Sequence, residues 1–183
     1  LELHTKRCVL RQWKDSDLPA WAAMNADAEV RRYFPSVASV EQALGEAQRC
    51  RDAIAQRGWG MWALEVPGVM PFAGFVGLNA PHYDAPWIPA VEIGWRLTRA
   101  AWGQGLATEA AIAALDFGFT RLLLREIVAI TVPANTPSRR VMDRLGMVRD
   151  EAADFDHPRI EAGHPLQRHL LYRVQQRLAT PPT

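Results

Sequence analysis

Eight residues near the middle of the chain, Trp102-Gly103-Gln104-Gly105-Leu106-Ala107-Thr108-Glu109, carry its strongest structural signal. They place a tight glycine turn between an apolar run at 91–97 and a segment at 105–119 with apolar residues at helical spacing. Glycine lets the backbone approach a ligand closely, and the free N–H groups at a helix start attract phosphate. Taken alone, the turn is equally consistent with a phosphate-binding loop and with an ordinary turn.

Two common phosphate-binding patterns fit this turn poorly. A dinucleotide fingerprint needs a small residue three positions after its second glycine, where this chain has Thr108, and it needs a parallel strand before the turn. A P-loop needs Gly-Lys-Ser/Thr, and the turn contains no lysine. Both patterns are therefore disfavoured.

The pattern around the turn predicts a single domain, residues 1–183, with a Pro-rich end at 177–183 expected as a frayed tail. Ser39 and Gln42 have capping-box spacing, and Gly58 supplies a helix stop. Four helices are expected, starting at about 15–17 and running to 24, and over 40–56, 105–119 and 135–145. Strands are expected over 5–13, 59–66, 72–78, 91–97, 126–132 and 166–174, with a further one starting at 147. An antiparallel middle followed by a strand–helix–strand crossover predicts an α/β fold, a mixed sheet with helices on both faces.

A second segment, Asn135 to Met147, follows an expected strand and opens a helix with Asn135 as its N-cap. Its three arginines, taken alone, are typical of a solvated helix face. Together with Val91-Glu92-Ile93-Gly94-Trp95 and the glycine turn, this segment resembles the GNAT superfamily of acetyl-CoA-dependent N-acetyltransferases, in particular the branch of bacterial ribosomal-protein N-terminal acetyltransferases. The resemblance implies a central, mostly antiparallel sheet with a parallel pair of splayed strands.

The resemblance also implies a site for acetyl-CoA as cosubstrate. The family pattern Arg/Gln-x-x-Gly-x-Gly/Ala falls on Trp102, Gly105 and Ala107, so Trp102 departs from the pattern while the backbone cradle remains. The residues implied are the cradle at Gly103, Gln104, Gly105, Ala107 and Thr108, the strand backbone at Trp95 and Leu97 for the pantetheine arm, and Asn135 and Ser138 lining that arm.

The catalytic residues are less completely specified. Many relatives carry a tyrosine acid where this chain has Met142, so Ser138 is the substitute proton donor, or simply a first-turn helix residue. Glu92 interrupts an apolar strand, which indicates either a base facing the substrate cleft or a surface position set by strand alternation. Asp150, with Glu151, is a reserve acidic group.

Composition excludes several other functions. With 21 basic and 20 acidic residues the net charge is +1, which argues against a general nucleic-acid binder. The longest apolar stretch, 110–119, is too short to span a membrane, and Cys8 and Cys50 have no metal-ligand spacing. The histidines and aspartates of 154–169 fit no metal motif either, so we expect no metal and a cytoplasmic protein. A homodimer is left open, since an exposed aromatic patch would favour one.

These observations predict an enzyme that passes acetyl from acetyl-CoA to a primary amine by direct attack in a ternary complex. The acceptor is either a protein N-terminus or a small amine such as a drug, polyamine or amino acid. A non-catalytic acyl-CoA-binding sensor is the alternative. Loops at 81–89 and 155–165, together with the first two helices, are expected to set specificity.

Overall fold

The computed structural model describes residues 1–176, so the tail expected at 177–183 lies outside the described residues. The helices are α1 (Leu18–Ala26), α2 (Val40–Arg57), α3 (Leu106–Thr120) and α4 (Thr136–Arg144). The strands are β1 (Leu3–His4), β2 (Val9–Arg11), β3 (Met61–Val66), β4 (Met70–Asn79), β5 (Glu92–Leu97), β6 (Glu126–Thr131), β7 (Val148–Arg149), β8 (Phe155–Asp156) and β9 (Arg168–Gln175). Helix positions and the three middle strands agree with the sequence prediction to within a few residues.

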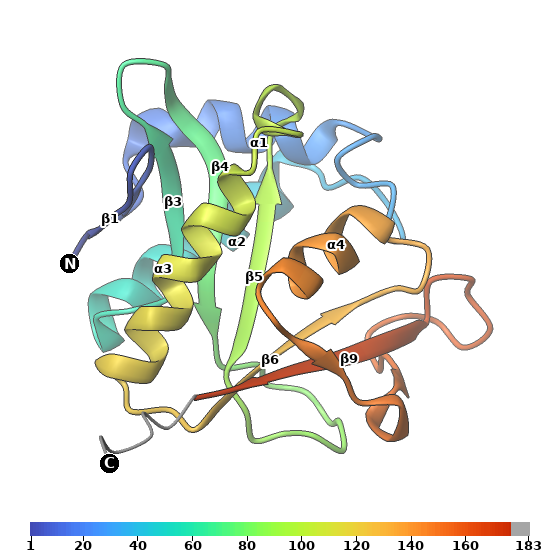
Figure 1. Cartoon of the computed structure of the whole chain (residues 1–183). Helices are drawn as coiled ribbons and strands as arrows, with labels where there is room; N and C mark the ends of the chain where they lie inside the picture. Colours follow the sequence, from blue (N-terminus) through green and yellow to red (C-terminus); the bar gives the residue numbers. More distant parts are fainter. Residues whose placement is uncertain (177–183) are drawn as a thin grey trace, which may run out of the picture.

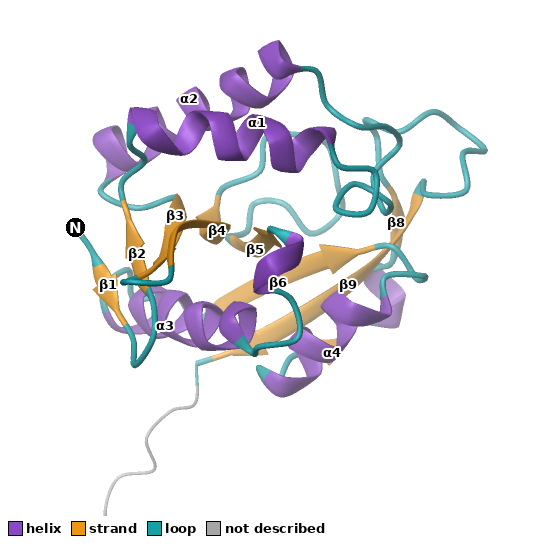
Figure 2. Cartoon of the chain, turned by 90° about the horizontal axis from the view of Figure 1, so that it is seen from above, coloured by secondary structure: helices purple, strands orange, loops and turns teal. Residues whose placement is uncertain are grey.

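The strands form one mixed sheet in the order β1-β2-β3-β4-β5-β6-β9-β7, with β8 pairing to β9. Neighbours are antiparallel except β5 and β6, which run parallel and are in register at one pair, Glu92 with Val128. Beyond that pair the two strands diverge, and α4 lies in front of the opening (Figure 1). Helices α3 and α4 cover one face of the sheet and α1 and α2 the other, as expected (Figure 2).

Small residues bring α3 close to the sheet. Ala110, Ala111 and Ala114 are fully buried, and a Cβ on Gly118 would lie 2.6 Å from Ile127 Cδ1. The close contact fixes where α3 begins relative to the end of β5. The glycine turn between them is therefore held by packing at both ends.

The expected opening strand at 5–13 is confirmed only over Val9–Arg11, which forms β2. Thr5 and Cys8 instead close a tight turn, in which Thr5 N donates to Cys8 O at 2.9 Å and Cys8 N donates to Thr5 Oγ1 at 2.8 Å. A threonine that bonds its own backbone neighbourhood competes with strand pairing. β2 pairs antiparallel with β1, which lies before the predicted range, so that the two form a hairpin around this turn; the short β8 was not foreseen.

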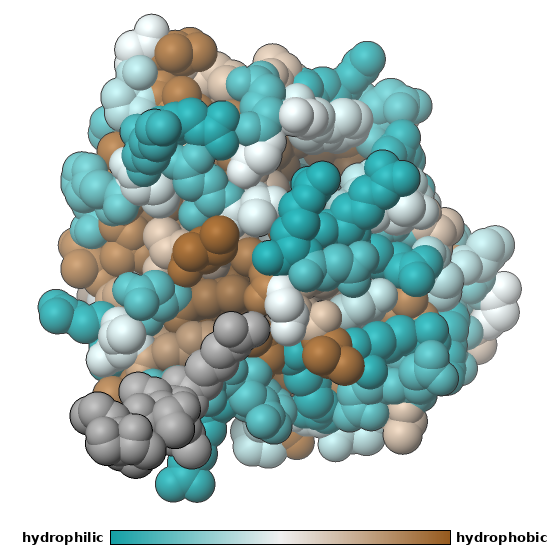
Figure 3. Space-filling model, viewed as in Figure 1, coloured by the Kyte–Doolittle hydropathy of each residue, from teal (hydrophilic) through white to brown (hydrophobic). Residues whose placement is uncertain are grey.

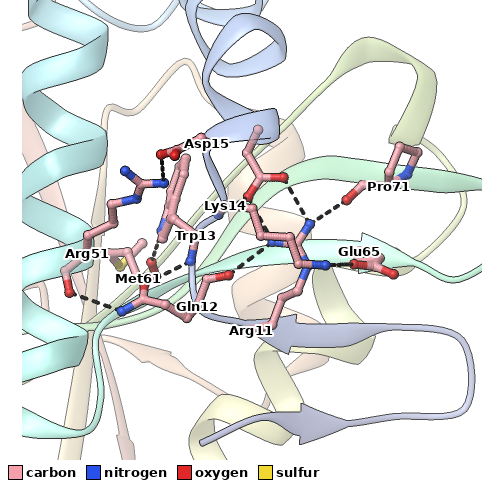
Figure 4. A network of polar contacts seen from close by, with 10 residues as sticks. Arg11, Gln12, Trp13, Lys14, Asp15, Arg51, Met61, Glu65 and Pro71 are labelled. Carbon is pink, nitrogen blue, oxygen red and sulfur yellow. Dashed lines mark hydrogen bonds and ion pairs between the residues drawn. The ribbon is translucent and has the colours of Figure 1, made fainter.

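A buried ion pair joins β2 to the start of α1. Arg11 makes two hydrogen bonds to Asp17, at 2.8 and 2.9 Å, with both side chains at least 97% buried. The same guanidinium donates to Glu65 on β3 at 2.5 Å and to the carbonyl of Pro71 at 2.6 Å (Figure 4). One side chain thus ties β2 to three other segments, the start of α1, β3 and β4, and this network was not predicted because only the fold brings its members together.

Within residues 1–176, every helix falls short of the length and apolarity required to cross a lipid bilayer.

Candidate active site

The diverging strands leave part of the β5 edge without a strand partner. Val128 N donates to Val91 O at 2.9 Å, so the carbonyl of Val91 points toward β6. Backbone groups alternate between the two edges of a strand, and the groups of Trp95 and Leu97, beyond the one register pair with β6, therefore face the opening. An extended ligand lying in the opening can bond to these groups as a further strand would.

Leu97, the last residue of β5, is only partly available. Its carbonyl accepts a hydrogen bond from the indole Nε1 of Trp102 at 2.9 Å. Trp102, which replaces the Arg or Gln of the family pattern, therefore anchors the glycine turn to β5. Of the two expected contacts on this strand, Trp95 keeps both backbone groups and Leu97 keeps its N–H.

The glycine turn presents unpaired backbone donors. Gly103 and Gly105 have φ of 72° and 75°, in the left-handed region that glycine adopts without strain, and Gly105 is the N-cap of α3. The first helical bond is donated by Glu109 N, so the N–H groups of Leu106, Ala107 and Thr108 have no partner within the helix. These donors point along the positive end of the helix dipole.

The hairpin turn at 5–8 holds this loop in place. Arg7 Nη1 donates to Gln104 O at 2.9 Å, and Arg7 Nε pairs with Glu109 at 2.7 Å. Gln104 therefore has its carbonyl occupied, and its N–H is the part of its backbone left for a ligand. The clamp fixes the geometry of the turn before any ligand binds.

A pocket of about 450 Å³ lies at this turn and reaches α4. It is lined by Gly103, Gly105, Thr108, Glu109, Ile112 and Arg144. The Oγ1 of Thr108 is buried and has no hydrogen-bond partner within the described residues, so it offers a bond to a bound group. These free donors and the nearby arginine fit a phosphate-bearing ligand.

Arg140 and Arg144 are exposed, as expected of a solvated helix face, and Arg144 also lines the pocket. Hydrophilic side chains gather over α4 and hydrophobic ones over α3 (Figure 3). Arg144 reaches the pocket at the start of α3, and Arg139 bonds Tyr172 Oη at 3.2 Å and the carbonyl of Pro133 at 3.3 Å. Sequence spacing could not reveal this, because it does not place α4 beside the glycine turn.

Ser138 and Trp95 meet across the opening. Trp95 Nε1 donates to Ser138 Oγ at 3.3 Å, which leaves the hydroxyl proton of Ser138 free to be donated elsewhere. Asn135 caps α4 as predicted, with its side chain accepting from Ser138 N at 3.2 Å. Met142, at the position of the missing tyrosine, is buried in the main core.

Glu92 lies where β5 and β6 begin to part. It is half-buried, and its carboxylate makes no hydrogen bond to another residue of the described chain. Burial raises its pKa from the usual 4.5 to about 7. A carboxyl group with such a pKa can take up and release a proton near neutral pH.

Asp150 has a different environment. Its carboxylate pairs with Arg173 Nε at 2.8 Å, and the same guanidinium pairs with Glu126 at 2.6 Å. Asp150 thus follows β7 in an ion-pair cluster beside β9, and none of its contacts reaches Trp95 or Ser138. It therefore remains a reserve group, held by its ion pair.

An aromatic cluster covers the sheet on the side of Glu92. Tyr83, Trp87, Phe155 and His157 pack together, with ring centroids 4.7 to 6.0 Å apart. Burial, His169 and Arg159 lower the pKa of His157 to about 4, so its ring is neutral at physiological pH. These side chains come from the two loops expected to set specificity.

Comparisons with known proteins agree with this arrangement. Residues 7–148 match the acetyltransferase (GNAT) domain family. The chain is 30% identical over 155 residues to the uncharacterized N-acetyltransferase p20 of Bacillus licheniformis, covering 81% of this chain and 85% of the relative. It is 29% identical over 150 residues to the uncharacterized N-acetyltransferase YnaD of Bacillus subtilis, covering 82% and 84%.

Solved structures show the same fold. A GNAT-family acetyltransferase from Bacillus anthracis superposes with a TM-score of 0.77 at 25% identity, covering 96% of this chain and 98% of that one. The ribosomal L7/L12 N-acetyltransferase RimL, solved in complex with coenzyme A, superposes with a TM-score of 0.74 at 20% identity, covering 96% and 98%. The match over most of the chain, together with the splayed parallel strands and the glycine turn, shows that this protein belongs to the GNAT family of N-acetyltransferases.

Proposed function

We propose that this protein transfers an acetyl group from acetyl-CoA to a primary amine by direct attack within a ternary complex. The observation that carries this proposal is the position of Glu92. A carboxyl group able to accept a proton near neutral pH lies at the closed end of an opening, and one wall of that opening carries the Ser138 hydroxyl. Of these two groups, the carboxylate can take a proton from the amine and the hydroxyl can give one to the leaving sulfur.

The cosubstrate would lie along α3, α4 and the free edge of β5. The N–H groups of Leu106, Ala107 and Thr108 and the side chain of Arg144 would hold its phosphates. The backbone of Trp95 and the N–H of Leu97 would pair with the extended arm. Acetyl-CoA bound in this way supplies the thioester carbonyl that the amine attacks.

The residues of this chain would then manage the protons. Glu92 accepts one proton from the acceptor's ammonium group, which frees the nitrogen lone pair to bond to the carbonyl carbon. The second proton that the nitrogen loses as the amide forms passes to solvent. A backbone N–H on the β5 edge stabilises the negative charge that develops on the carbonyl oxygen. Ser138 donates a proton to the sulfur as the carbon–sulfur bond breaks, and it regains a proton from solvent.

The pKa of Glu92 favours an α-amine as acceptor. Deprotonating an α-amine with a pKa near 8 costs about 1.4 kcal/mol at pH 7, whereas a lysine near 10.4 costs about 4.6 kcal/mol. A base with a pKa of about 7 is well matched to the first and poorly matched to the second. Protein N-termini and small weakly basic amines are thus the acceptor classes we expect.

The test is a thiol-release assay with acetyl-CoA against peptides with free N-termini, polyamines, amino acids and aminoglycosides. Gly105→Glu places a negative charge in the glycine turn, where the phosphates would bind, and it should abolish turnover and acetyl-CoA binding. Gly68→Glu is the matched control, because Gly68 has a similar φ of 73° in the turn between β3 and β4. Gly68→Glu should cause the same backbone strain without altering the glycine turn.

Turnover with one acceptor class, lost in Gly105→Glu and kept in Gly68→Glu, would support the proposal. Tight calorimetric binding of acetyl-CoA without turnover on any acceptor would favour the sensor, which the replacement of the usual tyrosine by Met142 motivates. Failure of the unmodified protein to bind acetyl-CoA would overturn both.

A further inference from the structure

Glu92 faces a small apolar cluster that is separate from the main core. The buried members of this cluster are Trp87, Val128, Phe155 and Leu171, and Tyr83 packs against them. Val128 is the register partner of Glu92, and paired residues on adjacent strands project to the same face of the sheet. The Glu92 carboxyl and the Tyr83 ring therefore lie on one face, at the point where β5 and β6 part.

The ring of Tyr83 is held firmly in this cluster. It meets Trp87 edge-on at a centroid distance of 5.8 Å and lies 4.7 Å from His157. The Arg159 guanidinium lies over the ring at 5.4 Å and also donates to the carbonyl of His82 at 2.9 Å. Three contacts of this kind fix where the phenol oxygen points.

That phenol oxygen has no partner. Tyr83 Oη is buried and makes no hydrogen bond within the described residues, and the same is true of Trp87 Nε1 in the same loop. Buried polar atoms in folded proteins are nearly always hydrogen-bonded, so each orphaned one needs an explanation. The Glu92 carboxylate, on the same face, is likewise without a hydrogen bond to a described residue.

We propose that Tyr83 is a positioning residue that holds the acceptor's amine against Glu92. The inference rests on the function proposed above and adds a residue to it. A primary ammonium group has three N–H donors, of which one would bond the Glu92 carboxylate and one the phenol oxygen. After one proton passes to Glu92, the bond to Tyr83 keeps the amine in place, and the freed lone pair can be directed along the opening.

The electrostatic surroundings keep Tyr83 in the required state. Burial raises the pKa of its phenol, and the charge of Glu92 raises it further, while Arg159 acts in the opposite direction. His157, the other titratable group against the ring, has a pKa of about 4 and is uncharged near neutrality. Tyr83 is therefore a neutral hydroxyl through the working pH range, able to accept from an ammonium without competing for its proton.

Tyr83→Phe removes only the oxygen and leaves the ring packing intact. Because a hydrogen bond to a charged group contributes more than a neutral one, the KM for the acceptor should rise about 10- to 100-fold while the KM for acetyl-CoA stays unchanged. Tyr33→Phe is the matched control. Its ring stacks under Arg32 in the loop between α1 and α2, and phenylalanine preserves that contact. Equal acceptor KM values in the unmodified protein and Tyr83→Phe would overturn the proposal.

A double-mutant cycle asks whether the two groups hold the same amine. If Tyr83 and Glu92 bond one nitrogen, Tyr83→Phe should have a much smaller effect in a Glu92→Gln background. Fully additive effects would mean that the residues act independently, and the proposal would fail.

A binding experiment separates this inference from the proposed function. In the coenzyme A complex, glycinamide, which carries a weakly basic α-amine, should shift the indole Nε1–H signal of Trp87 in NMR spectra. Binding should be about 10-fold or more weaker in Tyr83→Phe and unchanged in Tyr33→Phe. Normal coenzyme A binding with no amine binding, or with equal amine binding in Tyr83→Phe, would overturn the role of Tyr83 alone. Loss of coenzyme A binding in the unmodified protein would instead overturn the proposed function.

Discussion

Replacing Glu92 by glutamine is expected to make the protein more stable above neutral pH. The folded protein keeps the Glu92 proton up to a pKa of about 7, whereas the unfolded chain loses it near the usual 4.5. Between these two values the folded state binds more protons, so the unmodified protein loses stability as pH rises through the window. Glutamine has the same shape and does not titrate, and the variant should escape this loss.

The magnitude follows from the shift. A change in pKa from 4.5 to about 7 corresponds to about 3 kcal/mol, and Glu92 keeps some contact with water, so we expect about 2 to 3 kcal/mol. The gain of Glu92→Gln over the unmodified protein should be near zero at pH 4.5 and nearly complete at pH 8. The same substitution should abolish most of the activity. Gaining stability while losing activity is typical when a catalytic group is held in an environment that destabilises its charged form.

Urea unfolding followed by tryptophan fluorescence can measure this difference, since Trp21 and Trp62 are fully buried. Unfolding free energies would be compared at pH 5 and pH 8 for the unmodified protein, Glu92→Gln and Glu161→Gln. Glu161 is exposed in the loop after β8, so its variant should follow the unmodified protein at both values. If the unfolding free energy of Glu92→Gln depends on pH in the same way as that of the unmodified protein, burial does not raise the pKa of Glu92 as described.

Three further outcomes follow from the same contacts. Arg11→Ala should lower the unfolding free energy by about 3 to 5 kcal/mol in urea titrations, because it leaves a buried carboxylate unpaired. Arg144→Ala should weaken acetyl-CoA binding about 10-fold in calorimetry, and by a smaller factor at high salt. Arg140→Ala is the control, because Arg140 is exposed on the same helix outside the pocket, and its affinity should not change. Equal affinities of Arg144→Ala and the unmodified protein would show that Arg144 does not bind the phosphates. Ser138→Ala should lower kcat about 10- to 100-fold in the thiol-release assay, whereas Thr136→Ala should have no effect. An unchanged kcat in Ser138→Ala would mean that Ser138 is only a first-turn helix residue.

Local patterns were sufficient to predict most of the fold. The capping box at Ser39 and Gln42 and the left-handed Gly58 mark the ends of α2 as expected, because helix ends depend on neighbouring residues. The small residues of α3 likewise signalled close packing on the sheet. The strand expected at 5–13 is confirmed only at Val9–Arg11, because the Thr5 side chain closes a turn over the first residues, a choice that β-propensity does not register.

The site was predictable only in part. The glycine turn and Glu92 stand out in the sequence because each breaks a local pattern. The roles of Arg144 and of Tyr83 depend on residues distant in sequence: Arg144 and Gly103 are 41 positions apart, and Tyr83 and His157 are 74 apart. No spacing rule connects such residues until the strands diverge and α4 is placed against the opening.

The pH dependence of kcat/KM for acetyl transfer in the unmodified protein and in Glu92→Gln addresses the proposed mechanism directly. The base must be unprotonated, so the rate of the unmodified enzyme should rise with pH through a pKa of about 7. In Glu92→Gln the rate should fall by about 100-fold or more and that inflection should disappear, leaving only the titration of the acceptor amine. An inflection near pH 7 that persists in Glu92→Gln, or a variant as active as the unmodified enzyme, would contradict the assignment of Glu92 as the base.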